Sequence, residues 1–133
     1  MKLLLASHGN LSTGIKSSLE IIVGANIEVD AIAAYLDEIT LEQQISEYIT
    51  QTEVMPDLIL TDLYAGSVNQ KISAHEGFAN IPVISGMNLP LALQAVLMDV
   101  ANFDDAALKE LIEVSQNEIK RTQIVTDEDD FDF

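Results

Sequence analysis

Four short apolar runs are spaced along the chain, and each leads into a polar or glycine-containing loop. They predict strands at residues 2–7, 29–35, 57–62 and 81–85. The first run shows no alternation of polar and apolar residues, which is typical of a strand buried on both faces of its sheet.

Between these runs, apolar residues recur at the spacing of one helix face. The first such helix follows residue 10. Counted from Ile15, its apolar residues lie four, seven and eight positions later, at Leu19, Ile22 and Val23. Gly24 ends this pattern. A second helix is predicted to begin at Thr40, because Gln43 three residues later gives the spacing of a capping box.

Three further helices complete the pattern. One follows residue 67 and ends near Gly77, and the next two are predicted to be capped by Asn88 and Asp104. The apolar face of the last helix is predicted to consist of Leu108, Leu111, Ile112 and Ile119. Ser12 and Thr13 are interpreted as caps of the first helix, and residues 122–126 as a weak strand candidate.

Strands that alternate with helices indicate an α/β fold. We expect a doubly wound, mainly parallel four-stranded sheet with helices on both faces. In such sheets ligands bind at the carboxyl ends of the strands, where the strand order reverses. This rule selects three loops for the site, at residues 8–10, 62–67 and 85–88.

Composition narrows the class of protein. The chain has 133 residues and a formal net charge of −16, yet 48% of its residues are hydrophobic, so it can build a core. We expect one domain at residues 1–126 and an acidic, disordered tail at residues 127–133. The acidic balance disfavours nucleic acid and anionic membranes, both of which recruit Lys and Arg.

Missing residue types exclude further chemistry. The chain has no cysteine, which rules out disulfides and thiolate sites, and its two histidines are too few for a metal site. The apolar run of residues 3–6 is too short for a signal peptide, so we expect a cytoplasmic protein. No P-loop, dinucleotide-binding or Gly-x-Ser-x-Gly motif is present.

Two polar residues stand out in the loops that the sheet rule selects. His8 ends the first strand and Asp62 the third, so a carboxylate could fix the tautomer of the imidazole and leave its other nitrogen as a base or nucleophile. Ser67 and nearby amides could hold the oxygens of a transferred group. The alternative is that His8 and Asp62 are ordinary loop residues, and His75 is interpreted as a surface residue.

Three segments carry the motifs of a known family in the same order. Residues 4–24 place a His-Gly pair directly after an apolar strand, residues 58–70 place an Asp before a Gly-Ser turn, and residues 85–97 contain Gly-Met-Asn-Leu-Pro. Together they resemble the enzyme IIA domains of the mannose family of the bacterial sugar phosphotransferase system. A response-regulator receiver domain fits less well, because Ser7 and His8 stand where it needs acidic residues.

The resemblance implies a role for each matching residue. His8 corresponds to the histidine that accepts a phosphoryl group on Nε2 from the phosphocarrier protein HPr and passes it to the IIB component. Asp62 corresponds to the aspartate that orients this ring. Ser67, Gly9 and Gly66 are assigned to phosphoryl binding. No cofactor is implied, and the IIC and IID membrane components, which select the sugar, are indirect partners.

The chain also departs from the family pattern. The family reads Gly-Gly-Ser-Pro where this chain has Ala65, Gly66, Ser67 and Val68. The loss of a glycine limits positive φ at residue 65, and the loss of proline relaxes the helix start. The resemblance further implies a homodimer that exchanges a fifth, C-terminal strand, for which residues 122–126 are the candidate.

Two other functions remain open on sequence. The phosphotransfer subunit of a phosphoenolpyruvate-dependent dihydroxyacetone kinase resembles the same fold and carries the same histidine. A non-catalytic regulatory domain could also keep the fold. Phosphorylation of His8 would separate the first two functions from the third, and the partner that is bound would separate the first two from each other.

Overall fold

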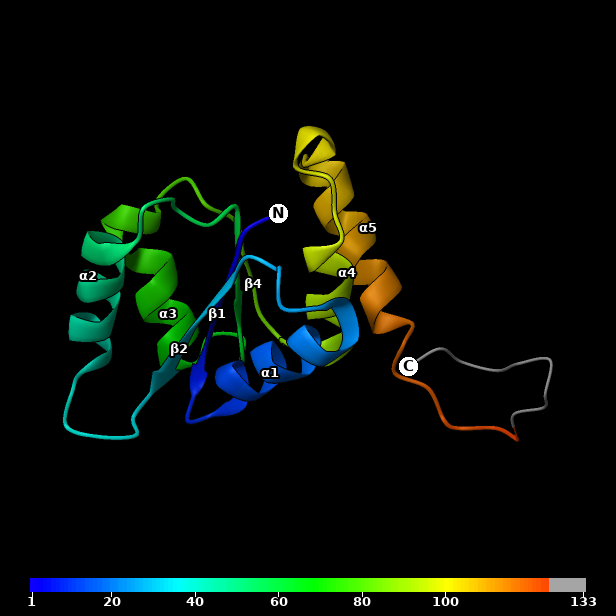
Figure 1. The fold of residues 1–133 in the computed structure, drawn as a ribbon, viewed down its shortest axis with the longest axis horizontal. Coiled ribbons are helices and arrows are strands. Elements are labelled where there is room, and N and C mark those ends of the chain that lie inside the picture. The colour runs from blue at the N-terminus through cyan, green and yellow to red at the C-terminus, as the bar shows by residue number, and fades with distance from the viewer. Residues whose placement is uncertain (125–133) are drawn as a thin grey trace.

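A parallel sheet lies between two layers of helices (Figure 1). The structure is a computed structural model that describes residues 1–124, and within them the sheet has four strands in the order β2-β1-β3-β4, all parallel. Their bounds are Leu3–His8 for β1, Val29–Ala34 for β2, Leu58–Thr61 for β3 and Val83–Ile84 for β4. The predicted fold class is confirmed.

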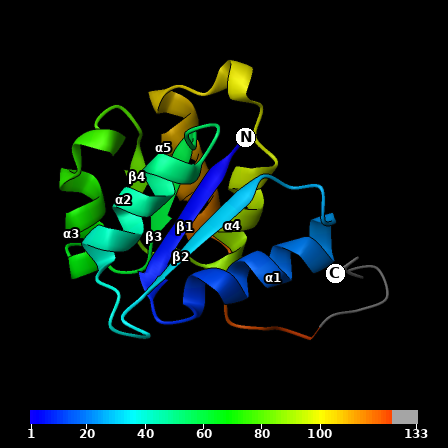
Figure 2. The same cartoon turned by 60° about the vertical axis from the view of Figure 1, so that its left-hand side comes forward.

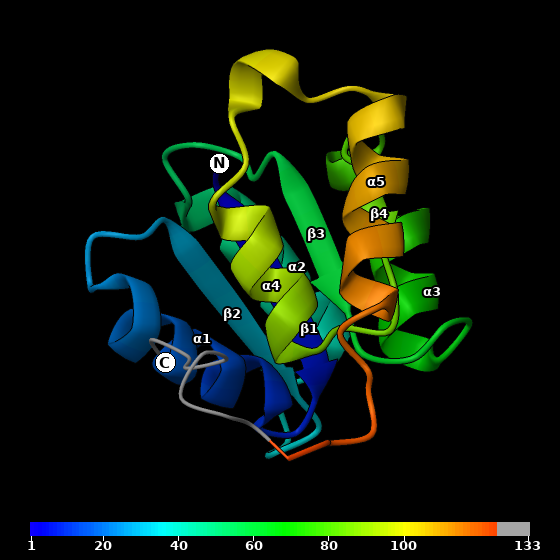
Figure 3. The same ribbon diagram turned by 90° about the vertical axis from the view of Figure 1, so that its right-hand side faces the viewer.

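The helices divide between the two faces of the sheet. They are α1 (Leu11–Val23), α2 (Leu41–Gln51), α3 (Ser67–Ala74), α4 (Leu89–Val96) and α5 (Asp105–Gln116), with short 3-10 turns at residues 76–78 and 100–102. Figures 1 and 2 show α2 and α3 on one face and α1 and α4 on the other. Figures 1 and 3 show α5 beside α4, on the same side of the sheet.

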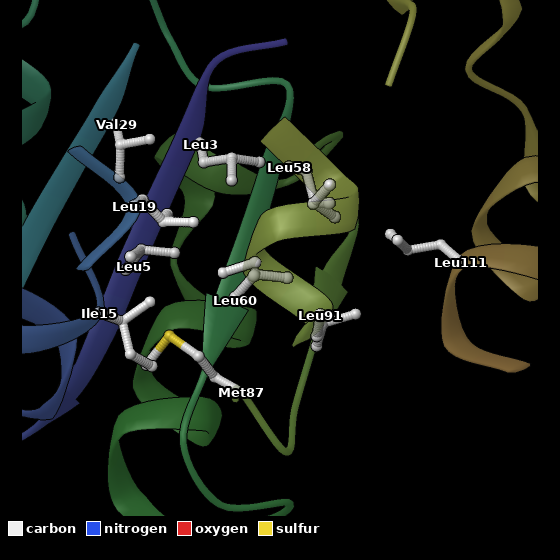
Figure 4. Packing of buried hydrophobic residues seen from close by; sticks show 12 residues of the cluster. Leu3, Leu5, Ile15, Leu19, Val29, Leu58, Leu60, Met87, Leu91 and Leu111 are labelled. Atoms are coloured by element: carbon white, nitrogen blue, oxygen red, sulfur yellow. The ribbon is translucent and has the colours of Figure 1, made fainter. Parts of the chain in front are cut away.

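Strand β1 supplies core residues to both faces. Leu3 and Leu5 join the cluster under α1 and α4, whereas Leu4 and Ala6 join the cluster under α2 and α3, because successive side chains of a strand alternate. Figure 4 shows the first cluster, with leucines of β1 and β3 packed against α1 and α4. Burial on both faces explains why this strand has no polar alternation, as the sequence predicted.

Side-chain caps begin three helices as the sequence predicted. Thr40 and Gln43 form the reciprocal capping box of α2. Asn88 accepts a hydrogen bond from the amide of the third residue of α4, and Asp104 does the same for α5. These bonds satisfy amides that have no partner within their own helix.

Helix α1 begins differently from the prediction. Ser12 and Thr13 are not its caps, because both lie inside the helix. The hydroxyl of Ser7, at the end of β1, accepts the Ser12 amide at 2.8 Å, and the Ser12 hydroxyl donates to the Ile32 carbonyl at 2.9 Å. A residue of the preceding strand thus caps the helix, which fixes the loop between β1 and α1.

The predicted element ends differ in places. Helix α3 stops at Ala74, and His75 accepts the Gly77 amide in a separate turn. Ile119 lies beyond the end of α5 and is 76% exposed, so it is not part of an apolar helix face. Residues 122–124 form no strand. The rest of the 122–126 candidate and the tail at 127–133 lie outside the described residues.

The topology fixes where loops meet. Strand β1 has β2 on one side and β3 on the other, so the strand order reverses between β1 and β3. The carboxyl ends of these parallel strands lie side by side, and the loops at residues 8–10 and 62–67 leave from there. In the part of the chain that the structure describes, no helix combines the length and the apolar character needed to cross a membrane.

Candidate functional site

His8 and Asp62 are joined by two hydrogen bonds at the carboxyl ends of β1 and β3. The His8 amide donates to Asp62 Oδ2 at 2.7 Å, and the same oxygen lies 2.7 Å from His8 Nδ1. Oδ1 accepts the Leu63 amide at 2.9 Å. The imidazole is 44% exposed and the carboxylate only 8%, so the carboxylate holds the ring from beneath while the ring faces solvent.

The charge state of Asp62 sets the tautomer of the ring. Burial opposes ionisation of this carboxyl, but hydrogen bonds from the His8 amide, the His8 ring and the Leu63 amide outweigh it and lower its pKa. An ionised carboxylate only accepts hydrogen bonds, so Nδ1 carries the proton. In the neutral ring Nε2 then keeps its lone pair.

Ser67 lies beside that nitrogen. Its Oγ is 3.4 Å from His8 Nε2, and it is the first residue of α3. Helix α1 begins at Leu11, three residues after His8. The starts of two helices therefore flank the imidazole, and helix starts attract anions through free amides and the helix dipole.

The two glycines shape the site through their backbones. Gly9 has a φ of 58° and its amide donates to the Ala34 carbonyl at 2.8 Å. The Gly66 amide donates to the Leu63 carbonyl at 3.1 Å. A Cβ on Gly66 would come within 3.2 Å of the Leu63 Cβ and 3.8 Å of His8 Cε1. A side chain at residue 66 would therefore crowd Leu63 within the loop and would only touch the ring.

Ala65 adopts a left-handed conformation, which glycine adopts most readily. Its φ is 60°, a left-handed value that L-residues other than glycine seldom adopt. Two side chains of α3 hold this turn: Asn69 Oδ1 accepts the Ala65 amide at 3.1 Å, and Gln70 Nε2 donates to the Ala65 carbonyl at 2.7 Å. The loop thus keeps the turn without the glycine. Val68, where the family has proline, is fully buried in the core under α2 and α3.

The third predicted loop supports the site without adding a side chain to it. The Gly86 amide donates to the Asp62 carbonyl at 3.1 Å, and the Met87 amide donates to the Thr61 carbonyl at 2.9 Å. Asn88 is occupied as the cap of α4. This loop therefore fixes the backbone from which the Asp62 side chain extends.

Tyr35 is a site residue that the sequence analysis missed. Its hydroxyl lies 2.8 Å from Ser67 Oγ, and its ring centroid is 5.2 Å from that of His8. The sheet rule could have identified it, because residue 35 directly follows β2 and the loop after β2 meets the same edge. His75, by contrast, is used in the turn after α3. Among residues 1–124, no group of three or more His, Asp or Glu side chains is arranged to hold a metal.

Comparison with solved structures gives close matches to the fold. The IIA subunit of the mannose/sorbose-specific phosphotransferase system from Enterococcus faecalis aligns with a TM-score of 0.77 and 22% identity, covering 94% of this chain and 96% of its own. The EIIA component of the phosphotransferase system from Streptococcus agalactiae aligns with a TM-score of 0.71 and 29% identity, covering 90% and 95%.

A third structure, the IIA protein associated with the fucose utilization operon of Streptococcus pneumoniae, has a TM-score of 0.68 and 24% identity, with coverage of 90% and 91%. A comparison with curated protein sequences gives no match. The family model described as the fructose IIA component of the phosphotransferase system matches residues 2–116. The chain therefore belongs to the mannose-type IIA family of the sugar phosphotransferase system.

Proposed function

We propose that this protein is a phosphoryl carrier whose His8 accepts a phosphoryl group from phospho-HPr and passes it to the IIB component. The observation that carries the proposal is the 2.7 Å contact between Asp62 Oδ2 and His8 Nδ1. It leaves Nε2 as the nitrogen with a free lone pair, on a ring that is 44% exposed. The transfer serves coupled sugar uptake and phosphorylation.

The transfer step exchanges one bond to phosphorus for another. The Nε2 lone pair attacks the phosphorus, a P–N bond forms, and the bond to the donor breaks with its electron pair left on the donor. The reverse exchange passes the group to the acceptor. Negative charge spreads over the phosphoryl oxygens in the transition state, so the step needs positioning and charge compensation.

The surroundings of His8 meet that need. The Ser67 hydroxyl and the starts of α1 and α3 offer hydrogen-bond donors and positive dipole ends. Residues 7–14, which carry His8, contain no acidic side chain that would repel the incoming group. The amides of Gly9 and Gly66 are already hydrogen-bonded within the protein. We therefore propose that these glycines shape the pocket and that the Ser67 hydroxyl forms the hydrogen bond to the phosphoryl group.

Exposed apolar side chains around His8 support a protein as the partner. Leu36 and Ile39 lie in the loop after β2, Leu63 and Tyr64 lie in the loop after β3, and Leu11 begins α1; each is about half exposed or more. Solvent-exposed apolar groups gathered about one catalytic side chain are typical of a docking surface. A protein donor that covers them would also exclude water from the transfer.

Charge and location follow from the same proposal. Without the five acids of the last seven residues, the net charge is still −11. This suits HPr, whose contact surface is basic, and the attraction raises the association rate. We place the protein in the cytoplasm, beside the membrane components of the transporter.

We also propose a homodimer in which a C-terminal strand at residues 122–126 pairs with the sheet of the partner. In residues 1–124, β4 is hydrogen-bonded to β3 alone, so the sheet keeps an edge that another strand could cover. Light scattering at micromolar concentration should give the mass of two chains. A monomer mass would contradict the exchange.

The function is tested with purified components. Incubation with enzyme I, HPr and labelled phosphoenolpyruvate should give an acid-labile, base-stable label that is lost in His8→Ala. An absence of label in the wild-type chain would favour a non-catalytic domain. Discharge of the label to a IIB protein, and not to a dihydroxyacetone kinase subunit, distinguishes the two carriers.

A further inference from the structure

Tyr35 connects the end of β2 to the start of α3 across the site. Its phenol oxygen lies 2.8 Å from Ser67 Oγ, and its ring is inclined by 49° to the His8 ring, 5.2 Å away. Strands β1 and β2 pair so that His8 lies opposite Ala34, the residue before Tyr35. The tyrosine thus reaches from an edge strand past the end of β1 to the hydroxyl beside Nε2.

The backbone of Tyr35 is in a costly conformation. Its φ is 67°, in the left-handed region, which residues with a side chain seldom adopt because the Cβ clashes with the backbone. Such conformations persist where the surrounding structure fixes them, and they gather at functional sites. Here the side chain that the conformation directs toward the site contacts both His8 and Ser67.

The hydrogen bonds around Ser67 allow one order of donation that reaches His8. Asp62 holds the ring proton on Nδ1, so Nε2 can only accept. Ser67 has a single hydrogen, and if it points at Nε2, then Oγ must accept from the Tyr35 hydroxyl. In that arrangement the order of donation is Tyr35 to Ser67 to His8, and the Ser67 hydrogen lies on the side of the nitrogen that takes up the phosphoryl group.

We propose that Tyr35 is a positioning residue for phosphoryl transfer at His8, acting through the Ser67 hydroxyl. This inference rests on the proposed function of His8. With Tyr35 donating to Oγ, the Ser67 hydrogen is kept off the phenol and is available for an oxygen of the arriving phosphoryl group, while the Nε2 lone pair, 3.4 Å from Oγ, is released for the attack. Without it, the serine hydroxyl is free to rotate and to bond water instead.

The test is a double-mutant cycle on the full chain. Tyr35→Phe keeps the ring and removes only the hydroxyl, and it should slow phosphorylation by about fivefold to tenfold, the effect of one lost hydrogen bond. In a Ser67→Ala background the same change should have no further effect. Tyr48→Phe is the matched control, because the Tyr48 hydroxyl bonds Asp30 near the opposite end of β2, and its transfer rate should equal that of the wild type.

Each reaction is run with two donors, phospho-HPr and phosphoramidate. Phosphoramidate is a small molecule that needs no docking surface: its P–N bond breaks, ammonia leaves, and the phosphoryl group passes to Nε2. Equal slowing with both donors supports the proposal. Slowing with phospho-HPr alone would make Tyr35 a docking contact and would overturn the proposal. The proposal would also be overturned if Tyr35→Phe slowed the reaction as much in the Ser67→Ala background as in the wild type.

The cycle also separates this inference from the function beneath it. If phosphoramidate labels His8 but phospho-HPr does not, the proposed partner is wrong, and the cycle with phosphoramidate still decides on Tyr35. If phospho-HPr labels His8 and Tyr35→Phe reacts at the wild-type rate, the positioning role of Tyr35 is wrong and the proposed function of His8 stands. If all variants unfold at the same midpoint, the differences in their reaction rates come from the site and not from a loss of stability.

Discussion

One carboxylate oxygen determines much of the chemistry at the scale of single residues. Asp62 Oδ2 accepts both the amide and the ring Nδ1 of His8, so the backbone and the side chain of the histidine are held by the same atom. Both bonds are 2.7 Å, and the acceptor is largely buried. Displacement or protonation of this carboxyl would release the ring and change its tautomer.

Asp62→Asn should preserve the fold and slow phosphorylation of His8 by on the order of 100-fold, the usual effect of losing acid–base organisation. An amide can donate to Nδ1, which moves the ring proton to Nε2 and blocks attack. The rate is measured by rapid quench with labelled phospho-HPr. Asp57→Asn is the control, because within residues 1–124 the Asp57 carboxylate accepts a hydrogen bond from the Lys2 amide alone. A wild-type rate in Asp62→Asn would remove Asp62 from the mechanism.

Acid should weaken the fold through the same group. The pKa of Asp62 in the folded chain is below its ordinary value of 3.8, so its ionised form adds stability that is present above that pH and is lost as the pH falls through the lower, folded value. The difference in unfolding free energy between the wild type and Asp62→Asn should be constant near neutral pH and shrink below about pH 4. Urea titrations across this range measure it, and a difference that grows on acidification would contradict the assignment.

At the scale of elements, the loops are held by contacts that local patterns do not reveal. Ser7 belongs to β1 yet caps α1, and Asn69 and Gln70 of α3 hold the preceding turn at Ala65. These bonds span four or five residues across a turn, so they form only once that turn has its shape. The caps of α2, α4 and α5 were predictable, because each lies at a fixed offset from its own helix.

Ala65→Gly tests whether the turn before α3 stores backbone strain. It should raise the free energy of unfolding by about 0.5–1 kcal/mol, because glycine adopts a positive φ without the clash of a Cβ. Ala106→Gly, in the first turn of α5, should lower the free energy of unfolding instead, because glycine is less favourable than alanine in a helix. Urea unfolding compares the two, and a loss of stability in Ala65→Gly would mean that the alanine methyl group is needed.

At the scale of the whole molecule, alternation of strands and helices was enough to predict the sheet, and the sheet rule was enough to bring His8 and Asp62 together. The rule failed to identify Tyr35 because it was applied to three loops and not to the loop after β2. The positive φ of Tyr35 is also invisible to sequence, since neither glycine nor asparagine marks the position.

The charge of the body of the molecule should matter more for docking than the charge of the tail. The rate of transfer from phospho-HPr should fall as salt rises, because screening over about 8 Å at physiological ionic strength weakens attraction between the partners. Replacing the five acids of residues 127–133 with amides should change this rate little. Stopped-flow transfer measured over a salt series gives both results. A rate that is independent of salt would contradict electrostatic docking.

The most direct test of the central claim is the position of the phosphoryl group on the protein. After reaction with phospho-HPr, long-range proton–nitrogen NMR correlations of the histidine rings should show one phosphorylated ring, that of His8, substituted at Nε2 with Nδ1 protonated. Substitution at Nδ1, or label on His75 or on a hydroxyl, would contradict the account, because Asp62 would then not be holding the ring in the tautomer that the geometry requires.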